Sequence, residues 1–246
     1  KINEMYKVDI LAIGAHPDDV ELCAGGTLLR AIHQGKTVGL LDLTHGELGT
    51  NGDGPTRLLE AEEAKKRIGA SWRSNLGIAD GFFTVSEDNI KAVARYIRLA
   101  RPQVILANAV SDRHPDHGRA AKLVNDAVFI SGLSKVDLRN DDGEIIERWR
   151  PKIVLNYLQD MHLAPNVVVD ITPYQEQKME VIRAYASQFF WNKDNIKTPI
   201  SGEDFWAFLE ARAREMGRAG GVVLGEGFTS MLPTLVNDLF DVLPEA

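Results

Sequence analysis

The chain has 246 residues, of which 44% are hydrophobic and 26% are charged, and this composition is typical of a globular protein with a sizeable core. A formal net charge of −7 argues against a nucleic-acid or anionic-membrane partner, because such binders need a basic face to displace counterions. No apolar stretch or apolar leader indicates a membrane span or secretory signal, and the single cysteine, Cys23, fits a reducing compartment, so we expect a cytoplasmic protein.

Apolar runs typical of strands alternate with amphipathic segments along the first 172 residues. The expected strands lie at 8–15, 37–44, 103–108, 152–158 and 166–172. Helices are expected at 20–34 and 56–68, each followed by glycine, and from an N-cap at Ser86 to about Arg101, where Pro102 ends the helix. This alternation predicts an α/β fold, a Rossmann-like three-layer sandwich with a mostly parallel sheet.

The pattern changes after residue 172. Two helical stretches are expected near 173–188 and 202–217, followed by the Gly-rich apolar segment GGVVLGEGF. No linker rich in proline or serine precedes this part of the chain. We therefore expect one domain over 1–246, with an α/β core at 1–172 and a helical and strand elaboration at 173–246.

Two related polar motifs each follow an expected strand: AHPDD at 15–19 and DRHPDH at 112–117. In open parallel sheets, ligands bind beyond the carboxyl ends of the strands, where both motifs fall. Each proline extends the backbone of the histidine before it, so the imidazole is placed at the exit from a strand. One such motif alone is typical of a capped turn, but two in one chain predict a shared metal site.

The metal ligands that we expect are His16, Asp19 and His117. Imidazole and carboxylate ligands suit zinc, and a catalytic zinc keeps three protein ligands and an open position for water. We therefore expect one Zn²⁺ per chain, although the same donor types also bind Fe²⁺, Co²⁺ or Mn²⁺.

Three further residues of the motifs are expected to be catalytic. Asp18 lies beside the ligands and is the expected general base for the attacking water, and His114 is the expected group that stabilises the oxyanion. We expect the Asp116 side chain to hydrogen-bond the His114 ring and to hold it as an imidazolium.

The same residues carry a family resemblance. AHPDDVEL together with HPDH resembles the LmbE/PIG-L family of zinc-dependent N-acetylglucosamine deacetylases, whose hallmark motif has glutamate where this chain has Val20. Further stretches resemble the branch of bacillithiol biosynthesis that deacetylates N-acetylglucosaminyl-malate, and they are LDLTHGELGTNG, TRLLEAEEA, SQF, KTP and GEGFTS. The resemblance spans nearly the whole chain, and it implies the ligands and the roles of Asp18 and His114 given above.

Three residues are expected to bind substrate. The resemblance implies that Arg57 and His162 face the substrate, and Arg113 is a second candidate for contact with a carboxylate, with a structural ion pair as the alternative. The glycine-rich loop at 46–54 is a candidate lid over the site.

The predicted function is hydrolysis of the acetyl group of an N-acetylglucosaminide, a small amino-sugar substrate, in a protein that we expect to be a homo-oligomer. N-acetylglucosaminyl-malate is the preferred substrate, and another N-acetylglucosamine conjugate or a chitin fragment is the alternative. A dinucleotide enzyme is disfavoured, because the first turn lacks G-x-G-x-x-G. A non-enzymatic metal-binding module would not need Asp18 and His114 beside the ligands.

Overall fold

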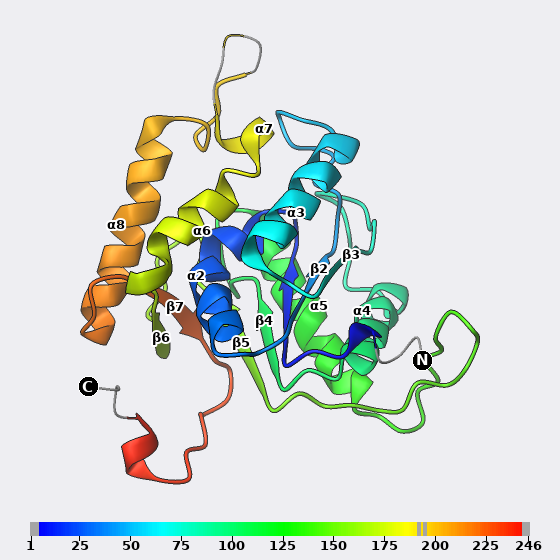
Figure 1. The fold of residues 1–246 in the computed structure, drawn as a ribbon. Coiled ribbons are helices and arrows are strands. Elements are labelled where there is room, and N and C mark those ends of the chain that lie inside the picture. Colours follow the sequence, from blue (N-terminus) through cyan, green and yellow to red (C-terminus); the bar gives the residue numbers. More distant parts are fainter. Residues whose placement is uncertain (1–4, 191–192, 194–195, 243–246) are drawn as a thin grey trace.

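The computed structural model describes residues 5–190, 193 and 196–242, and it shows a central sheet covered by helices (Figure 1). The seven strands lie in the order β3-β2-β1-β4-β5-β7-β6. Their bounds are β1 Ile10–Gly14, β2 Val38–Asp42, β3 Trp72–Asn75, β4 Val104–Ala107, β5 Ile153–Tyr157, β6 Val167–Asp170 and β7 Gly225–Thr229. The helices are α2 Asp19–His33, α3 Gly54–Ile68, α4 Glu87–Ala100, α5 Pro115–Ser131, α6 Gln175–Ile182, α7 Ala186–Phe189 and α8 Glu203–Gly220, with 3₁₀ turns η1 Thr172–Tyr174 and η2 Leu239–Val242.

The sheet is mostly parallel, as predicted. Strands β1 to β5 pair in parallel, and Ile10 of β1 is in register with Val38 of β2 on one side and Val104 of β4 on the other. Only β7, among the described strands, runs antiparallel to its neighbours β5 and β6. Because the chain leaves β1 toward β2 and leaves β4 toward β5, the strand order reverses between β1 and β4. Such a switch point is where open α/β sheets bind their ligands.

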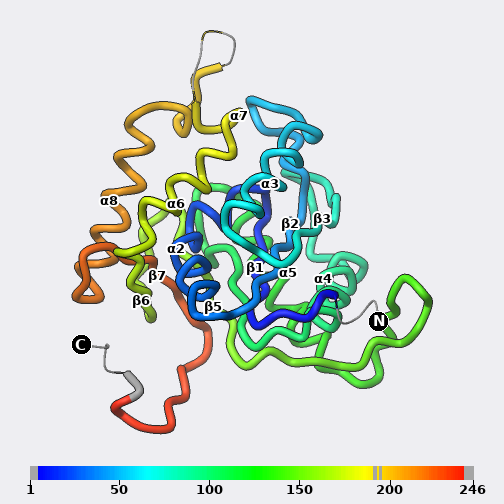
Figure 2. Tube along the Cα trace, viewed as in Figure 1, coloured from blue at the N-terminus to red at the C-terminus, as the bar shows by residue number. Residues whose placement is uncertain are grey.

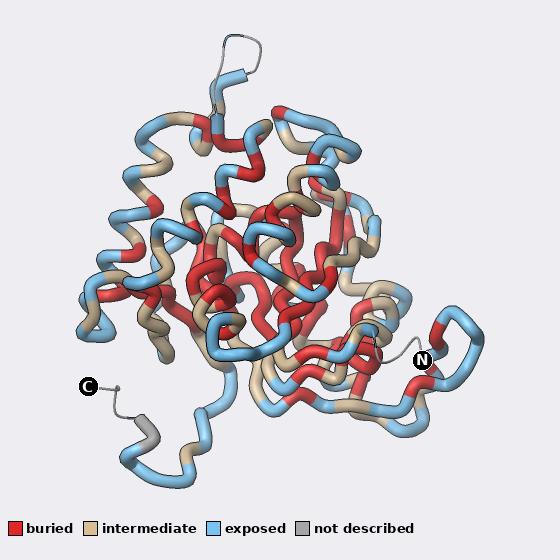
Figure 3. Tube along the Cα trace, viewed as in Figure 1, coloured by how far each residue is buried: buried red, intermediate tan, exposed pale blue. Residues whose placement is uncertain are grey.

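Two layers of helices bury the sheet. Helices α2, α3, α6 and α8 pack into one hydrophobic cluster, and α4 and α5 pack into the other. Helix α2 lies against α6 although the two are far apart in the sequence (Figure 2). Strand β2 is buried along its whole length, and the most buried part of the trace is the sheet (Figure 3). The continuous apolar strands follow from this burial on both faces, and the predicted fold class is confirmed.

Most predicted elements form, but strand β3 escaped the sequence analysis, and β7 was expected only without bounds, within the helical and strand elaboration that contains GGVVLGEGF. Strand β3 reads WRSN and is only partly buried, so it lacks the apolar run that marks the inner strands. Strand β7 reads GEGFT, and its glycines hide its strand character. The helix expected at 173–188 is divided into η1, α6 and α7, whereas Ser86 caps α4 as predicted, with its Oγ accepting a hydrogen bond from the Asn89 backbone N–H at 3.3 Å.

The segment after residue 172 contributes directly to the central sheet. Strand β7 inserts between β5 and β6, and α8 packs on both β6 and β7. This shared sheet supports the single-domain organisation, which stays a prediction. Among the described helices, none is long and apolar enough to cross a bilayer.

Candidate active site

The first motif forms the turn from β1 into α2. A Cβ atom at Gly14 would lie 3.0 Å from the His16 carbonyl oxygen and 3.2 Å from the Asp19 Cβ, so any larger residue would require the tight turn to shift by a few tenths of an ångström. The His16 backbone N–H donates to Asp19 Oδ2 at 3.0 Å. Asp18 has φ of 113°, in the region that side chains rarely adopt, and such strain is often found at functional sites.

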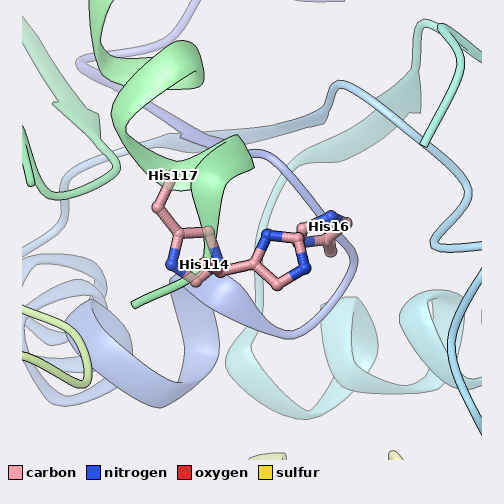
Figure 4. A group of neighbouring side chains, drawn as sticks. All are labelled: His16, His114 and His117. Carbon is pink, nitrogen blue, oxygen red and sulfur yellow. The ribbon is translucent and has the colours of Figure 1, made fainter. Parts of the chain in front are cut away.

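The second motif forms the start of α5. His114 is the N-cap residue, Pro115 is the first helical residue, and His117 lies in the first turn. Figure 4 shows the His114 and His117 rings at this helix end, beside the His16 ring from the β1–α2 turn. One nitrogen from each of the three rings lies within 4.8 Å of the others. The sheet therefore brings together two motifs that are about a hundred residues apart in the chain.

The three predicted ligands face one another. The Asp19 carboxylate lies between the two histidines, with Oδ2 3.6 Å from His16 Nδ1 and Oδ1 3.2 Å from His117 Nε2. Ligand atoms bonded at about 2.0–2.2 Å to one tetrahedral metal lie a little over 3 Å apart, close to these separations. His114 also lies within reach, so the donor set offers three imidazoles and one carboxylate.

Each of the two histidine ligands is backed by a carboxylate that the sequence analysis did not assign. His16 Nε2 is 2.9 Å from Asp80 Oδ1, and His117 Nδ1 is 2.6 Å from Asp112 Oδ2. A ligating histidine usually donates its second N–H to a carboxylate in this way, which orients the ring and raises its basicity. Asp112 stands inside the second motif, and Asp80 follows β3, the strand that the sequence pattern missed.

Two buried amides hold the Asp19 carboxylate. Asn108 Nδ2 donates to Oδ2 at 2.9 Å, and Gln159 Nε2 donates to Oδ1 at 3.1 Å. Asn108 follows β4 and Gln159 follows β5, so both side chains emerge from the same edge of the sheet as the motifs. Their positions shortly after strands are the signal from which the sequence analysis could have identified them.

The charges of the site favour a cation. Five carboxylates gather around the histidines, those of Asp18, Asp19, Asp80, Asp112 and Asp116. Burial lowers the pKa of His117, but attraction to Asp19 and the hydrogen bond to Asp112 outweigh it and raise the pKa to about 9. Imidazoles and carboxylates that converge in a negatively charged, largely buried site have the donor chemistry that a divalent transition metal requires.

Asp18 is buried and paired with Arg57. Arg57 Nη2 is 2.9 Å from Asp18 Oδ2, and the guanidinium also donates to the carbonyl oxygens of Pro17 and Gly46. Burial raises the pKa of Asp18 to about 7 against the opposing effect of Arg57. Arg57 lines the cavity, but it is only 4% exposed and its contacts point to positioning of Asp18 more than to a grip on substrate.

The predicted contact between the Asp116 side chain and His114 is wrong. As the N-cap residue, His114 accepts the Asp116 backbone N–H at Nδ1, at 3.2 Å, because the first helical turn has N–H groups to satisfy. The Asp116 carboxylate instead lies 3.3 Å from His16 Nε2 and accepts the Gly81 N–H. Burial and the neighbouring His16 and His117 lower the pKa of His114, which disfavours the predicted imidazolium. Because Nδ1 accepts the Asp116 N–H, the neutral ring carries its proton on Nε2.

The other two predicted substrate contacts are exposed. Arg113 lines the cavity, where its side chain is 62% exposed and pairs with Asp160. His162 is 65% exposed, pairs with Glu215 at 3.2 Å, and is absent from the described residues that line the cavity. The structure therefore brings Arg57 and Arg113 to the site but leaves His162 outside it.

A cavity of about 360 Å³ opens above the histidines. Its floor carries the two motifs with Asp80 and Gln159, and its outer wall comes from the loop after β2, the stretch 198–200 and α8. Helix α8 contributes Phe205, Phe208 and Arg212 to this wall. This volume lies in the range of small-molecule sites, and its mixture of apolar, aromatic and charged lining is typical of them.

Comparison with known proteins identifies the class of protein. The family model described as GlcNAc-PI de-N-acetylase (PIG-L) matches residues 11–128, which include both motifs. The conserved protein TT1542 of Thermus thermophilus is 34% identical, with 94% of this chain and 98% of that chain covered and a TM-score of 0.83. The chain belongs to the PIG-L family, whose de-N-acetylases are hydrolases of N-acetyl amides, so the predicted family and enzyme class are confirmed.

Two further relatives have named activities. The diacetylchitobiose deacetylase of Thermococcus kodakarensis is 28% identical, over 93% of this chain and 84% of that protein. The structure of N,N'-diacetylchitobiose deacetylase from Pyrococcus horikoshii is 27% identical, with 93% of this chain and 86% of that chain covered and a TM-score of 0.78.

Proposed function

We propose that this protein removes the acetyl group from an N-acetylglucosaminide, with one divalent metal, zinc first among the candidates, held by His16, Asp19 and His117. The observation that carries the proposal is the geometry of the cavity floor. Two carboxylate-backed imidazoles and the Asp19 carboxylate converge there, and Asp18 and His114 stand beside them. A site that only bound metal would have no use for a strained, buried acid and a further imidazole next to its ligands.

The chain's own residues then divide the work of hydrolysis. The metal, when bound, polarises the acetyl carbonyl and acidifies water. Asp18, oriented by Arg57, takes a proton from the water that attacks the carbonyl carbon. His114, with its proton on Nε2, donates a hydrogen bond to the oxygen that becomes negative. The C–N bond then breaks as the proton held by Asp18 passes to the leaving nitrogen, so the products are the free amino sugar and acetic acid, which ionises to acetate.

The preferred substrate is N-acetylglucosaminyl-malate. The stretches that resemble the bacillithiol branch favour it, and Arg113 at the cavity offers a guanidinium for a malate carboxylate. Diacetylchitobiose is the second candidate, because relatives that cover most of this chain are named for activity on it. The reducing cytoplasm and a homo-oligomeric state stay predictions, the former supported by the single cysteine.

Acetate release tests the proposal. The protein is stripped of metal and reconstituted with one equivalent of zinc, and N-acetylglucosaminyl-malate, diacetylchitobiose and N-acetylglucosamine are compared at equal concentration. We expect zinc-dependent turnover, fastest with the malate conjugate. Faster turnover of diacetylchitobiose would replace the preferred substrate with the second candidate. Absence of acetate from all three, with zinc bound, would favour a different acylated substrate or a metal-binding role.

A further inference from the structure

The outer wall of the cavity is built from two stretches that are far apart in the chain. Residues 48–51, in the loop between β2 and α3, line one part, and residues 198–200, before α8, line the adjoining part. Neither stretch belongs to a strand or helix. Hydrogen bonds from side chains therefore help to set their relative position.

Asn51 connects the first stretch to Ile196, which lies two residues before the second. Its side chain is buried, and both ends of its amide bond the backbone of Ile196: Nδ2 donates to the Ile196 carbonyl at 2.7 Å, and Oδ1 accepts the Ile196 N–H at 3.0 Å. This paired arrangement is the one that two peptide groups make in a sheet, and it fixes both distance and orientation. We call this pair of hydrogen bonds the Asn51 clasp.

The loop carrying the clasp is also anchored from behind. Gln188 Nε2 donates to the Asn51 carbonyl at 2.5 Å, and Glu60 of α3 accepts the N–H and the hydroxyl of Ser187, both at 2.7 Å. Gly52 has φ of 75°, and a Cβ atom there would lie 2.7 Å from Ser187 Oγ. Tight packing on α7 therefore leaves Asn51 little freedom, so the clasp holds the 198–200 stretch against a firm loop.

The other end of the same loop reaches the floor of the cavity. The Leu48 backbone N–H donates to Asp80 Oδ2 at 2.8 Å, while Asp80 Oδ1 lies 2.9 Å from His16 Nε2. The loop thus runs from a carboxylate behind the floor to the Asn51 clasp at the wall. These contacts describe a fixed part of the cavity wall, and a lid role for 46–54 stays a prediction.

We propose that Asn51 is a positioning residue for substrate binding, because it clasps the loop after β2 to the stretch before α8 and so sets the shape of the outer cavity wall. This inference rests on the proposed function for its substrate. A wall contacts the sugar equally before and during reaction, so loosening it weakens binding without slowing the chemical step. Asn51 contacts none of the predicted metal ligands in the described structure, so metal content is expected to stay unchanged.

The test compares Asn51→Ala and Asn51→Asp with the wild type. Asn51→Asp keeps the shape and the acceptor but replaces the donor to the Ile196 carbonyl with a second oxygen. The matched control is Asn125→Ala in α5, because the Asn125 side-chain amide donates to the Ala121 carbonyl of its own helix. We expect both Asn51 variants to raise KM for the best N-acetylglucosaminide about tenfold, with kcat within about twofold and the control unchanged.

Hydrogen exchange of the amides at 196–201, on the side of the clasp that Asn51 holds against the firm loop, is measured on the metal-loaded protein without substrate and gives a readout that does not need activity. We expect faster exchange in both Asn51 variants and none of this change in the control. Unchanged exchange in the Asn51 variants would overturn the inference. So would faster exchange with an unchanged KM, or a loss that affects kcat alone. If the wild type releases no acetate, the proposed function fails. The exchange measurement alone then tests whether Asn51 holds the two stretches together.

Discussion

The floor and the outer wall of the cavity are built in different ways. The floor side chains emerge from the ends of buried strands, and buried carboxylates and amides hold each predicted ligand in place. The wall comes from two loops and one face of α8, joined by bonds from the Asn51 side chain to backbone. The sheet therefore fixes the groups proposed for chemistry, while segments from distant parts of the chain shape the surface proposed for substrate selection.

The largest expected effect is a loss of turnover on substitution of Asp18, in the floor of the cavity. Asp18→Asn removes the general base but preserves the residue's shape, and asparagine tolerates positive φ better than most residues. We expect turnover to fall by about 10²- to 10⁴-fold while one zinc per chain is retained, measured by acetate release and metal analysis. His16→Ala serves as the contrast, because it is expected to lose both metal and turnover. Turnover of Asp18→Asn near the wild-type rate would remove Asp18 as the base.

A smaller effect is expected from the carboxylates behind the ligands. Asp80→Asn and Asp112→Asn each weaken the orientation and basicity of one histidine, and we expect zinc affinity to fall by about 10- to 100-fold. Competition with a chelator measures the affinity. Asp126→Asn is the control, because Asp126 forms an exposed ion pair with Lys122 on α5. Equal zinc affinity in all three variants would mean that Asp80 and Asp112 do not support the metal ligands.

The contribution of the exposed part of the cavity to substrate selection is tested by Arg113→Ala. If Arg113 meets a malate carboxylate, KM for N-acetylglucosaminyl-malate rises roughly tenfold and KM for diacetylchitobiose stays the same, since a rim charge contributes little beyond its own partner. Arg214→Ala on α8, another exposed arginine paired with a glutamate, is the control. Equal changes for both substrates would assign Arg113 to structure, through its pair with Asp160.

The smallest expected effect concerns Cys23, which lines the cavity but is only 4% exposed. Burial raises the pKa of the Cys23 thiol to about 12, so the thiol stays protonated at pH 8 and is a poor nucleophile. We expect no alkylation of the native protein by iodoacetamide under conditions that alkylate the unfolded chain completely. Rapid labelling of the native protein, followed by mass spectrometry, would instead show that the wall opens readily.

The fold class could be predicted, and the principal site residues could be proposed, because local patterns encode both. Continuous apolar runs marked the inner strands, and the two His-Pro motifs marked the turns that follow β1 and β4. The polar edge strand β3 and the glycine-containing β7 gave no such pattern, so Asp80 went unnoticed with the strand before it. The partner of Asp116 was mispredicted because a helix N-terminus has two groups that can reach an N-cap histidine, the backbone N–H and the side chain.

The sequence by itself determined the fold class, the two motifs and the chemistry of their donors, since strand and turn signals act over a few residues. Only the tertiary structure decided which carboxylate backs which histidine, that Arg57 pairs with Asp18, and that Asn51 meets Ile196. These contacts join residues separated by 5 to 145 positions, and most depend on the packing of whole elements, which no short stretch of sequence encodes.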